Sequence, residues 1–146
     1  MIRELKLREL DQVKKLFLDV FTHEPWDDEW ASDEQVTAYM TDLMGNKNSL
    51  SLGFFEEEEL TGLSLGYLFH WWQGDEYFIK EFCISRERQG KGLGSAFLRE
   101  MERFLKEKRI SAVWLATERP VPAYSFYLKN GFSEQPETVF LSKSIK

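Results

Sequence analysis

Gln89-Gly90-Lys91-Gly92-Leu93-Gly94-Ser95 is the stretch of the sequence that decides the fold. It lies between the strand-forming run YFIKEFCI (77–84) and a run whose apolar residues recur every three or four positions, as on one face of a helix. Three alternate glycines remove the Cβ atoms that keep a ligand away from the backbone, and the first N–H groups of a helix have no partners inside it. The stretch predicts a strand, a turn and a helix with an anion site at the helix N-terminus.

Two well-known phosphate-binding loops do not fit this stretch. A Walker loop has a glycine five positions before its Gly-Lys pair, but Ser85 stands there, and Gly92 follows Lys91 where serine or threonine is needed. A dinucleotide-binding fingerprint that begins at Gly90 needs a glycine where Ser95 stands. A flexible glycine turn without a ligand is the alternative, although glycines at a helix start reduce stability unless another use compensates.

The rest of the chain predicts helices packed on a mixed sheet. We expect strands over 2–7, 49–55, 60–72, 77–84 and 112–117, and one or two closing strands from residue 132 onward. We expect helices over 10–21, from Ser32 to Met44, from about Gly92 onward and over 121–129. Strands that are followed by a strand–helix–strand unit indicate an α/β (α+β layered) fold with a mixed, mostly antiparallel sheet. At 146 residues, the chain is expected to form one domain, 1–146.

Charge is distributed unevenly along the chain. The segment between Phe21 and Ile79 holds thirteen acidic residues and a single basic one, Lys47, so it carries −12, and the remainder carries +6. An acidic half attracts cations and a basic half attracts anions. Nucleic acid is not expected as a partner because a phosphate backbone needs a continuous basic footprint.

The residue types also indicate in which compartment we expect the protein and whether we expect it to bind a metal. The N-terminal residues are too charged for a signal peptide, and no apolar run reaches 18 residues, so we expect no membrane association. Cys83 is the only cysteine, which suits a reducing compartment, and we expect the cytoplasm. His23 and His70 have no second ligand at metal-binding spacing, so we expect no metal.

Two motifs resemble those of a known family. The run from Glu81 to Leu98 contains the pattern Gln/Arg-x-x-Gly-x-Gly/Ala and resembles the acetyl-coenzyme A signature of the GNAT N-acetyltransferase superfamily. The run Ala123-x-x-Phe126-Tyr127-x-x-x-Gly131-Phe132 resembles the C-terminal motif of that family. The resemblance implies a GNAT-like acyl-CoA N-acyltransferase fold with splayed central strands. It also implies acetyl transfer from acetyl-CoA directly to an amine, by a monomer or a homodimer.

The resemblance also implies where coenzyme A binds. The backbone of Phe82, Cys83 and Ile84 would pair with pantetheine like an added strand. The basic side chains of Arg86, Arg88 and Lys91 suit a phosphate site, although each is by default a solvated surface charge. Pro120 stands where relatives often have an asparagine, which leaves one coenzyme contact in doubt. The diphosphate would bind the backbone amides of Gln89, Gly90, Lys91, Gly92, Leu93, Gly94 and Ser95.

Acetyl transfer to an amine needs a base and an acid. An alkylammonium with a pKa near ~10 is almost fully protonated at neutral pH, so a base or a water relay has to take its proton. Glu81 is the first candidate, because strand alternation turns it away from Phe82 and apolar neighbours would raise its pKa. An edge or surface glutamate is the alternative, and Glu118 is a reserve base. Tyr127 matches the tyrosine that in many relatives protonates or hydrogen-bonds the departing thiolate, and plain core packing is its alternative. A lone strand cysteine such as Cys83 is expected to be inert packing.

The acidic segment is expected to form the acceptor side. We expect a cationic acceptor, such as a polyamine, an aminoglycoside-like aminosugar or a basic peptide amine, with Asp28, Asp75 and Glu76 as further counter-charges. An ordinary acidic surface around core aromatics is the alternative for each residue. A non-catalytic coenzyme A-binding sensor or interaction module is the alternative function, and a longer acyl donor stays open. The candidate substrate-binding residues are Glu24, Trp26, Asp27, Trp30, Trp71 and Glu118.

Overall fold

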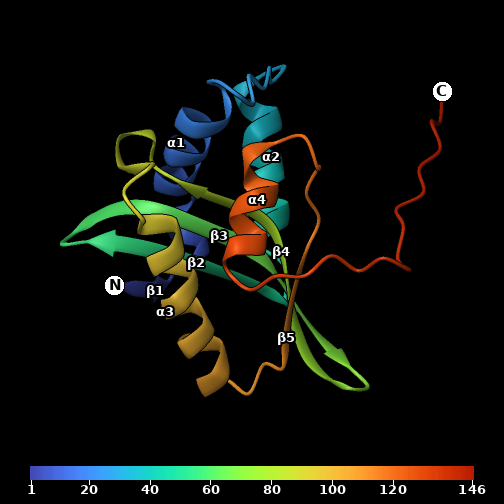
Figure 1. Ribbon diagram of the computed structural model, residues 1–146. Helices are drawn as coiled ribbons and strands as arrows, with labels where there is room; N and C mark the ends of the chain where they lie inside the picture. Colours follow the sequence, from blue (N-terminus) through green and yellow to red (C-terminus); the bar gives the residue numbers. More distant parts are fainter. The chain divides into compact units, whose positions relative to one another are not determined.

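The computed structural model describes residues 1–146, which divide into two units, 1–116 and 117–146. The first unit contains a five-stranded sheet in the order β1-β2-β3-β4-β5 (Figure 1). The first four strands pair antiparallel and β5 pairs parallel with β4, so the predicted mixed, mostly antiparallel sheet is confirmed. The strands are β1 (Ile2–Glu4), β2 (Ser49–Glu56), β3 (Glu59–Trp71), β4 (Gly74–Ile84) and β5 (Ala112–Leu115).

Helices cover both faces of this sheet (Figure 1). One face packs against α1 (Leu10–Phe21) and α2 (Asp33–Met44), which share a core with Leu63, Leu65 and Cys83. The other face packs against α3 (Leu93–Glu107), whose Phe97 ring stacks between Phe54 and Phe82 with centroids 5.2 Å from each. Short 3-10 helices, η1 (Leu7–Glu9) and η2 (Arg86–Arg88), precede α1 and α3.

The predicted start of the second helix is confirmed. The Ser32 hydroxyl accepts a hydrogen bond from the Gln35 amide at 3.1 Å, which satisfies one of the free N–H groups at the start of α2. The Gln35 side chain accepts from the amide of Ala31 at 2.7 Å. Side chains near in sequence therefore define this helix end.

A β-bulge in β4 sets which side chains face α1 and α2. Leu65 pairs with Glu81 and Gly66 pairs with Ile79, so Lys80 is an extra residue without a partner on β3. Because of it, Phe78 and Glu81 lie on the same face although they are three positions apart. A Cβ at residue 66 would stand 2.1 Å from the carbonyl oxygen of Phe78, so this close approach requires glycine.

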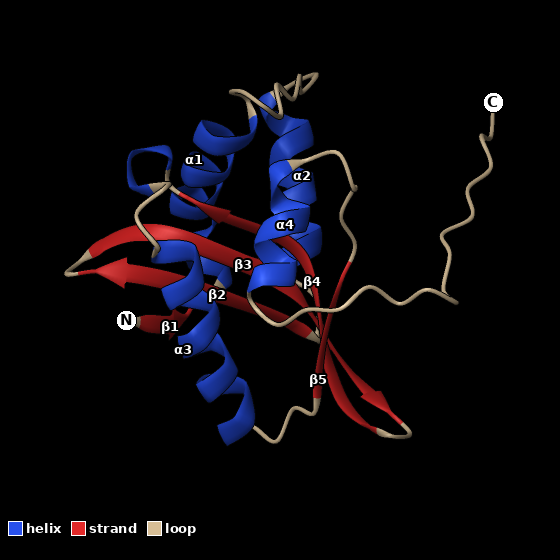
Figure 2. Cartoon of the chain, viewed as in Figure 1, coloured by secondary structure: helices blue, strands red, loops and turns tan.

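The β3–β4 hairpin extends beyond its neighbours (Figure 2). Its outer part, from Phe69 on β3, pairs with β4 alone, because the contacts on the β2 side end where Leu68 meets Asn48. Trp71 and Trp72 lie at this end and are exposed.

The second unit contains α4 (Pro122–Lys129), close to the predicted helix over 121–129. After α4 there is no helix or strand, so the prediction of closing strands from residue 132 onward is wrong. A strand needs a hydrogen-bonded neighbour as well as apolar side chains, and this segment pairs with none. Val139, Phe140 and Leu141 are correspondingly exposed.

Candidate active site

The glycine-rich turn presents unpaired backbone donors. Gly90 and Gly92 have φ of 77° and 79°, the left-handed region that favours glycine, and no atom lies within 4 Å of the position that a Cβ would take on either. The six amides from Gly90 to Ser95 donate no hydrogen bond, and no side chain caps α3. Such a row of outward N–H groups at the N-terminus of a 15-residue helix has the chemistry to hold a diphosphate.

Gln89 has a different role from the six residues after it. Its amide donates to the carbonyl of Arg86 at 3.4 Å, and its side-chain nitrogen donates to the carbonyl of Ile84 at 2.9 Å. Both bonds fold the turn back onto the end of β4. Gln89 therefore holds the turn in place and has no free backbone donor for a ligand.

Two of the three basic residues at the turn are already paired. The Arg86 guanidinium lies 3.0 Å from Asp19 on α1, and that of Arg88 lies 2.7 Å from Glu59 and also contacts Glu56. Lys91 forms no ion pair and is exposed. Lys91 is therefore the basic side chain at the turn whose charge has no carboxylate partner.

The pairing between β4 and β5 stops before the end of β4, the strand that leads into the turn. The ladder between β4 and β5 runs only from Glu76 to Ile79, whereas β4 continues to Ile84. Over the last residues of β4, the hydrogen-bonded neighbour is β3, which pairs with Phe82, Cys83 and Ile84. The last residues of β4 therefore have no strand partner on the β5 side, and they include the segment predicted to pair with pantetheine.

Glu81 is the ionisable side chain that the bulge directs to the α1–α2 face. It is half-buried, and its carboxylate accepts a short hydrogen bond from the hydroxyl of Tyr39 on α2. Desolvation raises the pKa of Glu81, while the Tyr39 hydrogen bond and the charge of Lys80 act in the opposite direction. A carboxylate with a raised pKa beside an apolar wall has the character of a general base.

Aromatic rings surround the Tyr39–Glu81 pair. The Tyr39 ring lies 5.5 Å from Trp30 and 6.1 Å from Phe17, measured between centroids. The indole Nε1 of Trp30 is buried and has no hydrogen-bond partner. Asp28 lies close enough to raise the pKa of both Tyr39 and Glu81. The result is an aromatic wall with acidic groups, the environment that binds organic cations.

Cys83 lies on the same face of β4 but is buried in the core. Burial, and then the charge of Glu81, raises the pKa of its thiol far above the usual range. The thiol is therefore protonated at neutral pH and is a poor nucleophile.

The structure brings only some of the sequence candidates near Glu81. Trp30 lies against Tyr39, and Trp26 packs 5.5 Å from Phe21 in the same aromatic cluster. Trp71 lies six residues along β3 from Leu65, the partner of Glu81, which is about 20 Å in an extended strand. Trp71 therefore does not join this site.

The remaining candidates lie elsewhere. Glu24 and Asp27 are exposed in the loop between α1 and α2. Glu118 and Tyr127 belong to the second unit. There the Tyr127 ring packs edge-on against Phe126 and Phe132, with centroids at 5.3 and 5.4 Å.

Tyr39 is the functional candidate that sequence reasoning missed. A weak signal was present, because Tyr39 follows Val36 by three positions and so lies next to the buried stripe of α2. What the sequence could not show is its partner, since Glu81 is 42 residues away.

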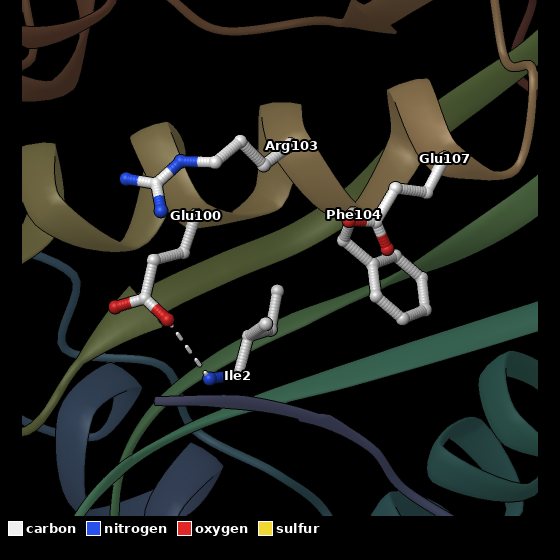
Figure 3. Close-up of a pocket in the computed structure, with 5 residues that line it drawn as sticks. All are labelled: Ile2, Glu100, Arg103, Phe104 and Glu107. Atoms are coloured by element: carbon white, nitrogen blue, oxygen red, sulfur yellow. Dashed lines mark hydrogen bonds between the residues drawn. The ribbon is translucent and has the colours of Figure 1, made fainter.

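A shallow hollow lies on the opposite side of the sheet, between β1 and α3 (Figure 3). It is lined by Ile2, Glu100, Arg103, Phe104 and Glu107. Glu100 accepts a hydrogen bond from the amide of Ile2 at 3.2 Å and lies 3.7 Å from the N-terminal ammonium. Its polar groups therefore attach the N-terminal strand to α3, and the hollow does not adjoin Glu81.

No group of three His, Cys, Asp or Glu side chains is arranged to hold a metal ion. None of the helices has the length and apolar character needed to cross a bilayer.

The comparisons with known proteins point in one direction. The model of the acetyltransferase (GNAT) family matches residues 10–132. No curated protein matches in a sequence search. Among solved structures, a possible acetyltransferase from Clostridium difficile 630 aligns with a TM-score of 0.82 at 14% identity, covering 100% of this chain and 98% of the other.

Two other solved structures share the fold. An aminoglycoside acetyltransferase from an uncultured soil metagenomic sample, in complex with sisomicin, aligns with a TM-score of 0.75 at 16% identity, covering 100% of this chain and 96% of that one. A GNAT family acetyltransferase from Staphylococcus aureus aligns with a TM-score of 0.71 at 17% identity, covering 99% and 98% of the two chains. At these identities, the similarity shows the fold.

Proposed function

Because the chain belongs to the GNAT acetyltransferase family, we propose that it moves an acetyl group from acetyl-CoA directly to a primary amine of a small cationic molecule. One observation carries the proposal: Glu81, a half-buried carboxylate with a raised pKa, stands on the same strand that leads into a turn of unpaired amides. A base and an anion site joined by one strand are what acetyl transfer from a phosphate-bearing donor requires.

The donor side would be held by backbone groups. The amides of Gly90 to Ser95 would bind the diphosphate, with Lys91 adding a charge that no carboxylate neutralises. The end of β4, beyond its ladder with β5, would pair with pantetheine. When bound there, acetyl-CoA supplies the thioester whose acetyl carbon is attacked.

In the proposed reaction, Glu81 accepts the proton that the ammonium must lose before its nitrogen can attack. A bond then forms from that nitrogen to the acetyl carbon, the carbon–sulfur bond breaks, and the sulfur leaves with the electron pair. Tyr127 is proposed to give a proton to that sulfur, since a phenol and a thiol have similar pKa values, and the second proton that the acylated nitrogen loses restores the phenol. The products are an N-acetylated amine and free coenzyme A.

Three features favour a cationic acceptor. Glu81 and Asp28 supply negative charge next to the rings of Trp30 and Tyr39. The segment between Phe21 and Ile79 carries −12 and contributes α2 of this face and the loop that precedes it. Aminoglycoside acetyltransferases are among the structural neighbours, which makes aminoglycosides the first amines to test.

The test is a thiol-release assay with acetyl-CoA and a panel of polyamines, aminoglycosides, basic peptides and neutral amines. We expect turnover with cationic amines, and a loss of kcat of about 10²–10⁴-fold in Glu81→Gln with coenzyme A affinity preserved by calorimetry. Equal or better turnover of neutral amines would refute the cationic acceptor. Coenzyme A binding without turnover of any amine would favour a non-catalytic coenzyme A-binding module.

The compartment is also part of the proposal. Cys83 is the only cysteine, and it is reduced and buried, so the fold uses no disulfide. This chemistry suits a reducing compartment, and we propose the cytoplasm.

A further inference from the structure

The Tyr39–Glu81 contact joins an element of the acceptor side to the proposed base. The Tyr39 hydroxyl on α2 donates to Oε2 of Glu81 on β4, and neither group has another hydrogen-bond partner. The other oxygen of Glu81, Oε1, is therefore left to receive a proton. The Tyr39 ring is fixed by its contacts with Phe17 and Trp30, so the hydroxyl is held in one place.

Each element packed around Glu81 carries charged or titratable groups, and only some of them act on its carboxylate. Lys80 and Cys83 come from β4 itself, and Asp28 comes from the loop after α1. On α1, Asp19 is paired with Arg86, and on β3, Tyr67 donates to the Asp42 carbonyl at 2.5 Å. The sole hydrogen bond to the Glu81 carboxylate comes from Tyr39.

The hydrogen bond from Tyr39 opposes the effect of burial on the ionisation of Glu81. Desolvation disfavours the ionised carboxylate, and the negative charge of Asp28 adds to that effect. A hydroxyl that donates to the ionised form favours it, and Tyr39 can donate at every working pH because burial and the Glu81 charge raise its own pKa.

We propose that Tyr39 is a positioning residue for the acetyl transfer, which holds the Glu81 carboxylate ionised and turns its free oxygen toward the amine. This inference rests on the proposed function, since it assigns Tyr39 a role through the proposed base. Removing the hydroxyl while keeping the ring would separate the role from simple packing.

The experiment compares Tyr39→Phe with Tyr67→Phe, which removes a neighbouring hydroxyl that does not touch Glu81. The pH dependence of kcat/KM is measured with the best amine of the panel, whose own ionisation is the same for every variant. We expect Tyr39→Phe to shift the acidic limb upward by about one pH unit or more, with roughly tenfold lower kcat/KM below the limb. Tyr67→Phe should follow the wild-type profile.

A second readout does not depend on turnover. The carboxyl carbon of Glu81, labelled with carbon-13 and assigned with Glu81→Gln, is titrated by NMR in the folded wild type and in Tyr39→Phe. An upward shift of the Glu81 midpoint in Tyr39→Phe supports the proposal, and an unchanged midpoint overturns it. If the wild type turns over no amine, the proposed function fails. If the wild type and Tyr39→Phe turn over the amine with the same acidic limb in their pH profiles, only the role of Tyr39 is refuted.

Discussion

Gly66→Ala should destabilise the protein, because residue 66 lies against the bulge at Lys80. The added Cβ would stand 2.1 Å from the carbonyl oxygen of Phe78 and 3.1 Å from the Cα of Ile79, against 3.4–4 Å for ordinary contact. These are backbone atoms, so no side-chain rotation relieves the clash. Overpacking typically costs about 1–3 kcal/mol, and we expect the upper end, ~3 kcal/mol.

Activity should fall by more than this loss of stability explains. If β4 relieves the clash by expelling the extra residue, the alternation after Lys80 changes phase, and Glu81 turns away from Tyr39. A displacement of about 1 Å at a reacting group can cost about 10²-fold in rate. We expect kcat/KM to fall by roughly 100-fold under conditions in which the variant is still folded.

The assay pairs Gly66→Ala with Gly53→Ala. A Cβ at Gly53 would meet side-chain atoms of Leu60 and Phe55 at 2.8 Å, which can rotate, so this variant is destabilised without turning Glu81. Thermal unfolding should show a lower Tm for Gly66→Ala, by about 6–12 °C for ~3 kcal/mol. Wild-type kcat/KM in folded Gly66→Ala, or an equal loss in Gly53→Ala, would refute the reasoning.

Three other predictions concern the base and the turn. Glu81→Gln should abolish the acidic limb of the pH profile of kcat/KM, and it should raise the free energy of unfolding at pH 7, measured with urea. The reason is that the pKa of Glu81 is raised in the folded state, so its contribution to stability falls as pH rises from about 4.3 through the folded pKa. A lower free energy of unfolding at pH 7 in the variant would contradict this. Gly92→Ala should lower the free energy of unfolding by only about 1–2 kcal/mol, since a φ of 79° strains alanine but the surroundings are open. It should also weaken coenzyme A binding in calorimetry by at least about tenfold. Gly131→Ala, with a φ of 91° and equally open space, controls for strain, and equal coenzyme A affinities of the two variants would refute the role of the turn. Lys91→Ala should weaken coenzyme A binding by about 3–10-fold at low salt and less at high salt, and an effect that does not depend on salt would count against a charge contact.

Features that depend on residues close in sequence were predictable. The Ser32 cap, the glycine turn before α3 and the β2–β3 hairpin each arise from short patterns, and each was predicted to within a few residues. The predicted strand after residue 132 failed for the same reason, since apolar residues alone do not supply a pairing partner.

Features that depend on distant contacts were not predictable. The bulge needs Gly66 on one strand to meet Phe78 on the next, and nothing in either local pattern marks Lys80 as the extra residue. Period-two alternation applied across β4 would place Glu81 with Tyr77 and Ile79, away from α2. The local rule gave the correct orientation relative to Phe82, but the partner Tyr39 became visible only in the fold.

This difference explains why the donor side is easier to read from sequence than the acceptor side. Glu81, the strand end and the turn follow one another along the chain within 81–95, so the backbone itself fixes their order and spacing. The proposed acceptor side consists of α2 and the loop over 22–32, which join β4 through packing between residues far apart in sequence. A change in that loop can alter which amine is bound without altering the base or the anion site. Amine selectivity should therefore respond to substitutions around Trp30 and Asp28, while coenzyme A affinity should not.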